Sequence, residues 1–195
     1  MMRILTLLML SLLLIACGQD KAPSPTVAFV GSDVSDVTLT SDFVLSDHNG
    51  QPRKLADFQG KVVALFFGYT HCPDVCPTTL YDLAQAVKQM GDQGKQVQVL
   101  FITLDSPRDT QELLGKYVPS FHPDFLGLRG DEASTIKVTQ DFKVYYVKQE
   151  SKSRAGYIID HTAGVYVFDK TGKLRVIMKN GQSSKDMAHD LGLLI

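Results

Sequence analysis

The sequence has few cysteines and almost no net charge. Only three of its 195 residues are cysteine, and 20 lysines and arginines stand against 21 aspartates and glutamates. Three cysteines are too few for a disulfide-rich secreted scaffold or a four-cysteine zinc site. The balanced charge argues against nucleic acid binding through a large basic surface. Internal repeats, low-complexity tracts and blocks of one charge are also absent, so we expect one ordinary domain with a buried core.

No apolar run is long enough to span a bilayer comfortably. The run at residues 4–16 is shorter than the roughly 20 residues that a membrane helix needs, and Arg3 precedes it. The four residues that end at Cys17 (LIAC) are similar to a bacterial lipobox, in which cleavage before the cysteine accompanies lipidation of its sulfur. We therefore predict a signal peptide over residues 1–16 and a lipid on Cys17. The alternative is an uncleaved anchor with an incidental cysteine.

The segment after Cys17 has the composition of a spacer. It is rich in small polar residues and includes Pro23 and Pro25. We predict a lipidated tether over 17–37 and a single domain over 38–195, exported and held on the outer face of a bacterial membrane, periplasmic or extracytoplasmic. The alternative for the tether is a partly ordered first strand around residues 27–30.

The order of the predicted elements indicates an α/β fold. A hairpin turn at Asn49-Gly50 is followed by an apolar strand over 61–68, a helix over 80–90 and a second apolar strand over 97–104. Asp109 and Glu112 resemble a capping box that opens the next helix. The later elements are a strand near 125–128, a helix near 131–142, a strand near 144–147, a hairpin over 165–179 and a helix from Ser183. This order predicts a thioredoxin-like sandwich: a central mixed sheet flanked by helices, with an added N-terminal hairpin.

Two cysteines lie in the loop between the first apolar strand and its helix. Cys72 and Cys76 are four residues apart, and Pro77 suits the first turn of a helix. Loops at the carboxyl ends of strands are where α/β sheets place their sites. The positive end of the helix dipole is expected to favour the thiolate of Cys76. The pair could form a structural disulfide, cycle between redox states or bind a metal, and spacing alone does not choose.

A histidine is the most informative further donor. His161 ends a short apolar strand that a thioredoxin-like fold places opposite the cysteine loop. Ordinary thioredoxins set a cis-proline there, but this sequence has no proline after Pro123, which leaves space for an imidazole. His48, His122 and His189 fit a solvated surface, and His71 fits a loop position beside Cys72.

Three segments carry a resemblance to a known family. Residues 69–77 (YTHCPDVCP), 103–110 (TLDSPRDT) and 157–162 (YIIDHT) resemble segments of the Sco/SenC family of thioredoxin-like copper proteins, which help to assemble the copper A centre of cytochrome c oxidase. The resemblance implies that Cys72, Cys76 and His161 are copper ligands. It also places Asp105 in an acidic loop near the site, with a role in partner contact or redox tuning; the alternative is a carboxylate that only ends a strand or forms a turn. Many family members have a transmembrane anchor, whereas this chain resembles a lipoprotein.

Two functions follow from this resemblance and from the donor chemistry. Two thiolates and an imidazole suit Cu(I) in a three-coordinate site and can also accept Cu(II), whereas zinc would normally take a fourth ligand. We expect a copper chaperone that delivers to the oxidase subunit with the copper A centre. Its further partners would be other copper chaperones or thiol reductants. The alternative is a thiol-disulfide reductase that uses Cys72 and Cys76 on the same partner. A thiol peroxidase fits the motif poorly, and an inert disulfide is the remaining alternative.

Overall fold

The computed structural model describes residues 28–39, 43–151 and 156–195. The predicted signal peptide and the predicted lipidation site, Cys17, lie outside these residues. Within them, no helix combines the length and the apolar character that crossing a membrane requires.

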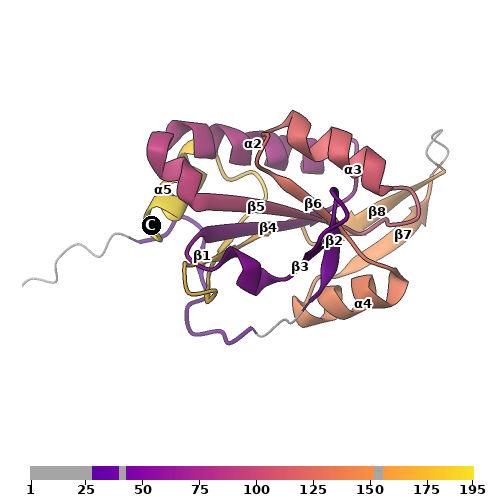
Figure 1. The fold of residues 1–195 in the computed structure, drawn as a ribbon, viewed down its shortest axis with the longest axis horizontal. Helices are drawn as coiled ribbons and strands as arrows, with labels where there is room; N and C mark the ends of the chain where they lie inside the picture. Colours follow the sequence, from indigo (N-terminus) through magenta and orange to yellow (C-terminus); the bar gives the residue numbers. More distant parts are fainter. Residues whose placement is uncertain (1–27, 40–42, 152–155) are drawn as a thin grey trace, which may run out of the picture.

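The fold is a mixed sheet with helices on both faces, as predicted (Figure 1). The strands of the main sheet follow the order β1-β10-β9-β4-β5-β6-β2-β3. They are β1 (Ser32–Asp33), β2 (Leu45–Asp47), β3 (Pro52–Arg53), β4 (Val62–Gly68), β5 (Val97–Thr103), β6 (Leu126–Arg129), β9 (Val165–Phe168) and β10 (Leu174–Met178). Strands β4, β5 and β6 run parallel, and β9 and β10 are antiparallel to their neighbours.

The two central strands form the centre of the core. Every residue of β4 and of β5 is buried, as expected for continuous apolar strands that are covered on both faces. The largest buried side chains include Phe66 and Phe67 of β4 and Phe101 of β5. Because β4 and β5 are parallel and adjacent, their carboxyl ends open at the same edge of the sheet. The cysteine loop follows β4 at this edge.

Four α-helices cover the sheet. They are α2 (Val75–Gln89), α3 (Gln111–Tyr117), α4 (Glu132–Asp141) and α5 (Ser184–Gly192), and short 3-10 helices span η1 (Leu55–Phe58), η2 (Gly91–Gln96) and η3 (Val118–Ser120). Figure 1 shows α2 and α3 on one face and α4 on the other. The N-caps of α4 and α5 are Asp131 and Ser183, whose side chains accept backbone N–H bonds.

The start of α3 differs from the prediction. The N-cap is Thr110, whose hydroxyl accepts the N–H of Leu113. Asp109 is fully buried and its carboxylate points into the domain instead of capping the helix. A capping-box pattern does not distinguish an exposed cap from a buried acceptor, because both roles use the same residue type.

Residues before the predicted domain boundary already pack on the domain. The buried carboxylate of Asp190 in α5 accepts the N–H groups of Val30 and Gly31 at 2.7 and 2.9 Å. Strand β1 then pairs with β10. Residues 30–34, which the sequence places in the tether, are therefore bonded to α5 and β10. The predicted N-terminal hairpin is present as β2 and β3.

A second, two-stranded sheet stands beside the first. Its strands are β7 (Tyr146–Glu150) and β8 (Tyr157–His161), which pair antiparallel with Tyr146 opposite His161. Figure 1 shows this ribbon at the end of the molecule where α3 and α4 lie. It brings His161 to the edge of the main sheet that holds the cysteine loop.

Candidate metal centre

A tight loop holds the two thiols together. The N–H of Cys72 donates to the carbonyl of Tyr69 at 3.2 Å, which turns the chain directly after β4. Helix α2 then starts at Val75, and the N–H of Cys76 in its first turn lies 3.4 Å from the Cys72 sulfur. Both cysteines are free thiols; Cys72 is half-buried and Cys76 is buried. Neither thiol is locked in a disulfide, so both are available as ligands or as a redox pair.

His161 completes a group of three donors. Its Nε2 lies 3.5 Å from the sulfur of Cys76, and the ligand atoms of Cys72, Cys76 and His161 all lie within 4.8 Å of one another. Its Nδ1 lies 2.9 Å from the carbonyl of Thr162. A carbonyl only accepts, so Nδ1 carries a proton, and Nε2 is the ring nitrogen that faces the sulfurs. The predicted residues therefore converge from chain positions 85 apart.

The two thiols differ in acidity. Hydrogen bonds from Cys76 and then from His161, with the amides of Asp74 and Cys76, outweigh burial and lower the pKa of Cys72 to about 4. The bond to Cys72, followed by burial, raises the pKa of Cys76 well above its ordinary value. The prediction that Cys76 is the thiolate is therefore wrong: the helix N-terminus is near both sulfurs, but Cys76 is more deeply buried. A metal that binds both sulfurs must displace the Cys76 proton.

Aromatic rings line the inner side of the group. The rings of Phe66 and Tyr69 lie edge-on to His161, with centroids 6.2 and 6.1 Å away. The hydroxyl of Tyr69 accepts the backbone N–H of Ile159 at 3.1 Å. A shallow cavity of about 210 Å³ opens on the outer side, between Cys72 and β8. The donors are therefore packed from within and reachable from one direction.

Asp105 lies in a polar cluster behind the group. Its side chain has no exposed surface; it pairs with Arg108 and accepts the hydroxyl of Tyr157 at 2.7 Å. The Arg108 guanidinium lies 3.5 Å from the centroid of the Tyr157 ring and donates to the Tyr157 carbonyl at 3.0 Å. Since Tyr157 begins β8, these contacts connect Asp105 to the strand that carries His161.

Asp109 links the cysteine loop to β5. Its carboxylate accepts the N–H of Thr70 at 3.0 Å and the Thr70 hydroxyl at 2.6 Å, and it also accepts the hydroxyl of Thr103. His71 lies next to this pair and its Nδ1 is 3.8 Å from Asp109. His71 therefore faces Asp109 and Thr70, which hold the cysteine loop, and not the sulfurs, as predicted.

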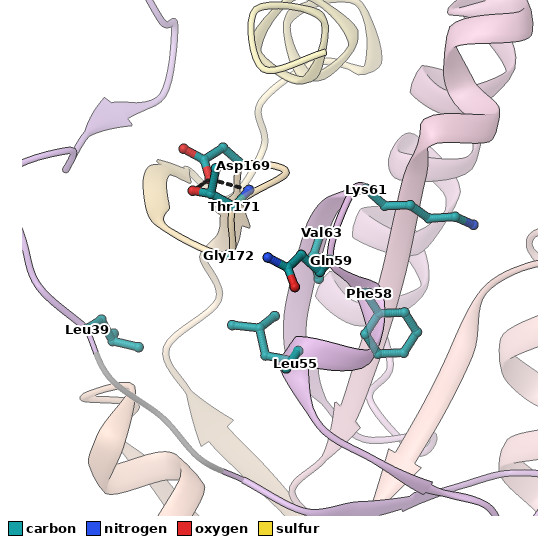
Figure 2. A pocket seen from close by; sticks show the side chains of 10 residues that line it. Leu39, Leu55, Phe58, Gln59, Lys61, Val63, Asp169, Thr171 and Gly172 are labelled. Carbon is teal, nitrogen blue, oxygen red and sulfur yellow. Dashed lines mark hydrogen bonds between the residues drawn. The ribbon is translucent and has the colours of Figure 1, made fainter.

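The other predicted surface histidines lie apart from this group. His48 accepts the N–H of Gly127, His122 accepts the N–H of Asp124, and the ring of His189 contacts the carbonyl of Ala28. The cavity drawn in Figure 2, of about 330 Å³, lies at the opposite end of β4 from the cysteines. Its Asp169 already binds Thr171 and Arg175. That cavity therefore offers no comparable donor group.

A family model described as SCO1/SenC matches residues 32–195. The chain belongs to the SCO1/SenC family. The match covers the whole sheet and all three donors.

Individual relatives agree with this assignment. The mitochondrial SCO2 homolog of Bos taurus is 43% identical over 133 residues, which cover 67% of this chain and 50% of the relative. A SCO2-like protein of Rickettsia felis is 35% identical over 71% of this chain and 68% of its own. The structure of Bradyrhizobium japonicum ScoI with copper bound has a TM-score of 0.72 and 34% identity, covering 86% of this chain and 100% of that one. The chain spans about half the length of the mammalian relatives it matches.

Sequence reasoning missed Gly68, Tyr69 and Arg108. All three lie in or beside segments that carried the resemblance, but only their cysteine and acidic neighbours were singled out. Gly68 is the most constrained: a Cβ built on it would lie 2.9 Å from the sulfur of Cys76 and 2.7 Å from the ring of Phe101. The last residue of β4 must therefore lack a side chain for Cys76 to occupy its position.

Replacing Gly68 with alanine is expected to displace Cys76. The new methyl group overpacks a buried position, so we expect Gly68→Ala to lower the free energy of unfolding by about 1–3 kcal/mol and to weaken metal binding. The measurements are urea denaturation and metal titration of the reduced protein. Gly192→Ala, where a Cβ meets nothing within 4 Å, is the control and should change stability by less than about 0.5 kcal/mol. Equal effects of the two variants would contradict the steric constraint.

Alkylation should label the two thiols in a fixed order. The low pKa of Cys72 keeps it a thiolate above about pH 4, whereas Cys76 is protonated and buried. With limiting iodoacetamide at about pH 6, we expect peptide mass spectrometry to find the label on Cys72. Unfolding in guanidinium should make both cysteines reactive at alkaline pH. Preferential labelling of Cys76 in the folded protein would refute the assignment.

Proposed function

We propose that this protein binds one copper ion through Cys72, Cys76 and His161 and delivers it during assembly of cytochrome c oxidase. The convergence of two free thiols and one correctly oriented imidazole is the observation that carries the proposal. Family membership supports it, as does the copper-bound structure of the Bradyrhizobium japonicum relative. The proposed recipient is the oxidase subunit that holds the copper A centre.

The donor set favours copper over the other metal ions that an exported protein can meet. Two sulfurs and one nitrogen match the soft, low-coordinate preference of Cu(I), and the same set accepts Cu(II). A structural zinc ion takes four ligands, and the metal-binding group found among the described residues contains three. One open side also suits transfer, because a recipient's ligand can approach from the cavity beside Cys72 before a bond to this protein breaks.

Copper binding and disulfide formation compete for the same sulfurs. Joining the Cys72 thiolate to Cys76 releases the Cys76 proton and two electrons, which an acceptor disulfide or another oxidant must take up, and leaves only the imidazole as a strong ligand. The copper-binding form is therefore the reduced form. In an exported protein, an outside thiol reductant would then be a partner as necessary as the copper donor.

We also propose that Cys17 carries a lipid that holds the domain outside the cytoplasm. The lipobox-like residues before Cys17 support this anchor. The described domain begins close behind it, because Val30 and Gly31 are already bonded to Asp190. The tether between lipid and domain then spans at most residues 18–29, which is shorter than the composition alone indicated.

Thiol-disulfide reduction is the second candidate function. The acidic, half-buried Cys72 next to a protonated Cys76 is the arrangement of an attacking thiolate with a resolving thiol. In this mode the protein would reduce the recipient's cysteines and become a disulfide itself. His161 would then assist only through its contact with Cys76.

Replacing His161 separates the two functions. We expect His161→Ala to weaken copper binding to the reduced protein by about tenfold or more, which is at least about 1.4 kcal/mol, because a third ligand is lost. Reduction of a model disulfide should persist, since both thiols remain. Competition titration with a Cu(I) chelator and a dithiol assay provide the measurements. His122→Ala is the matched control; unchanged copper affinity in His161→Ala would exclude the ligand assignment.

Cells that lack the protein should lose oxidase activity and regain it with added copper. A chaperone is bypassed when its cargo is abundant, whereas a missing reductant is not. The measurement is oxidase activity with and without copper in the medium, alongside the redox state of the recipient's cysteines. Failure of copper to restore activity, together with oxidised recipient cysteines, would favour the reductase over the chaperone.

A further inference from the structure

A second cavity, of about 350 Å³, lies on the other side of the β7–β8 ribbon from the copper site. We call it the Arg129 cavity; its lining includes Leu104, Ser106, Arg129, Glu132, Tyr146 and Lys148. The loops after β5 and β6, the start of α4 and strand β7 enclose it. Tyr146 is paired directly with His161, so the cavity is one strand away from the proposed copper ligand.

The floor of the cavity holds polar atoms without partners. Among the described residues, the buried Nε of Arg129 and the buried Oγ of Ser106 have no hydrogen bond. The Nη2 of Arg129 donates to the Ser106 carbonyl at 3.1 Å, which fixes the guanidinium, and no described carboxylate pairs with Arg129. Buried donors normally have acceptors, so the Nε of Arg129 is open to an acceptor that enters the cavity.

The geometry of the guanidinium favours a carboxylate at Arg129. The formal charges of the lining balance, because Arg129 and Lys148 stand against Asp131 and Glu132. Of the two acidic residues in the lining, Asp131 already caps α4 by accepting the N–H of Ser134 at 2.8 Å, and Glu132 is exposed at the rim. A planar guanidinium with a free Nε is suited to a carboxylate, which accepts two hydrogen bonds in the same plane.

Strand β7 presents unpaired backbone groups beside this cavity. Hydrogen bonds from Thr162 to Tyr145 and from Ser151 to Gly156 flank the ribbon. Alternation along an antiparallel pair then directs the N–H and C=O groups of Tyr146 and Lys148 away from β8. Within the described residues, β7 pairs with β8 alone. An edge of this kind accepts an additional strand.

The corresponding edge of β8 is already used. The N–H of Ile159 donates to the Tyr69 hydroxyl, and the Tyr157 carbonyl accepts from Arg108. An incoming strand can therefore pair on the β7 side, next to the Arg129 cavity, but not on the β8 side. The unpaired edge and the unpaired Nε of Arg129 line the same cavity, although they come from different parts of the chain.

We propose that the Arg129 cavity and the free edge of β7 dock an extended, carboxylate-bearing segment of the protein that exchanges copper with this one. The segment adds a strand to β7 through Tyr146 and Lys148 and places an Asp or Glu side chain on Arg129 and Ser106. The identity of this partner rests on the proposed copper function. The docking places the partner one strand from His161 and leaves the open side at Cys72 free for transfer.

The test uses a capped peptide, Thr-Val-Glu-Val-Thr, and its counterpart with Gln in place of Glu. On the reduced full-length protein, we expect the Glu peptide to shift the NMR signals of the Arg129 Nε–H and of the Tyr146 and Lys148 amides. The Gln peptide should bind at least about fivefold more weakly. Shifts located elsewhere, equal binding of the two peptides, or no shift at millimolar peptide would overturn the proposal.

Two variants separate the carboxylate contact from the strand pairing. Arg129→Gln should remove the preference for Glu over Gln, whereas Lys148→Pro deletes one outward N–H and should weaken both peptides while leaving the bonds to β8. Lys88→Gln, at an exposed position on α2, is the charge control, and this variant should bind both peptides like the wild type. Unaltered peptide binding in Arg129→Gln and Lys148→Pro would overturn the proposal.

Copper titration of the same samples distinguishes the two hypotheses. Both variants should bind copper like the wild type, because neither residue touches the three donors. If the wild type binds no copper, the proposed function fails, while the peptide results still decide the docking groove. If the wild type binds copper but the peptides do not shift the named signals, the groove fails and the function stands.

Discussion

The site depends on holding a short ribbon strand against a loop from a distant part of the chain. Strand β8 carries His161, yet it belongs to a two-stranded sheet outside the main one. Two side chains hold β8 in place. The Tyr69 hydroxyl accepts the Ile159 N–H, and Arg108 contacts both the carbonyl and the ring of Tyr157. Asp105 forms an ion pair with Arg108 and holds its guanidinium in place. Without these contacts, the imidazole would have no fixed distance from the sulfurs.

The same arrangement reconciles burial with reactivity. The core side of the site is packed by Gly68 and the aromatic rings, so Cys76 is held within the domain and keeps its proton. Cys72 and the cavity beside it face outward, so exchange can start there. The buried thiol and the half-buried thiolate thus have different tasks, although they are four residues apart. A metal bound to both would be retained by one sulfur while the other is displaced.

The main sheet and the three donors were predictable, but their supports were not. Continuous apolar runs specify β4 and β5 because a fully covered strand has no alternating pattern to satisfy. Cys72, Cys76 and His161 were identified from residue type and from the family segments. The role of Asp109 was predicted wrongly, because an acidic residue near a helix start reads as a cap whether or not it is buried. Tyr69 acts through its contact with Ile159, 90 positions away, and Gly68 through the close approach of Cys76 and Phe101. Both arrangements form only when the chain folds.

The position of the ribbon also explains why a docking surface and a metal site can share one element. In β7 and β8, alternate backbone groups point to opposite edges. On β8, the outward backbone groups form hydrogen bonds with Tyr69 and Arg108, which hold the strand of His161 in place. On β7, the equivalent groups of Tyr146 and Lys148 are available to the proposed partner. Because Tyr146 and His161 are directly paired, the unpaired edge of β7 lies one strand away from the imidazole.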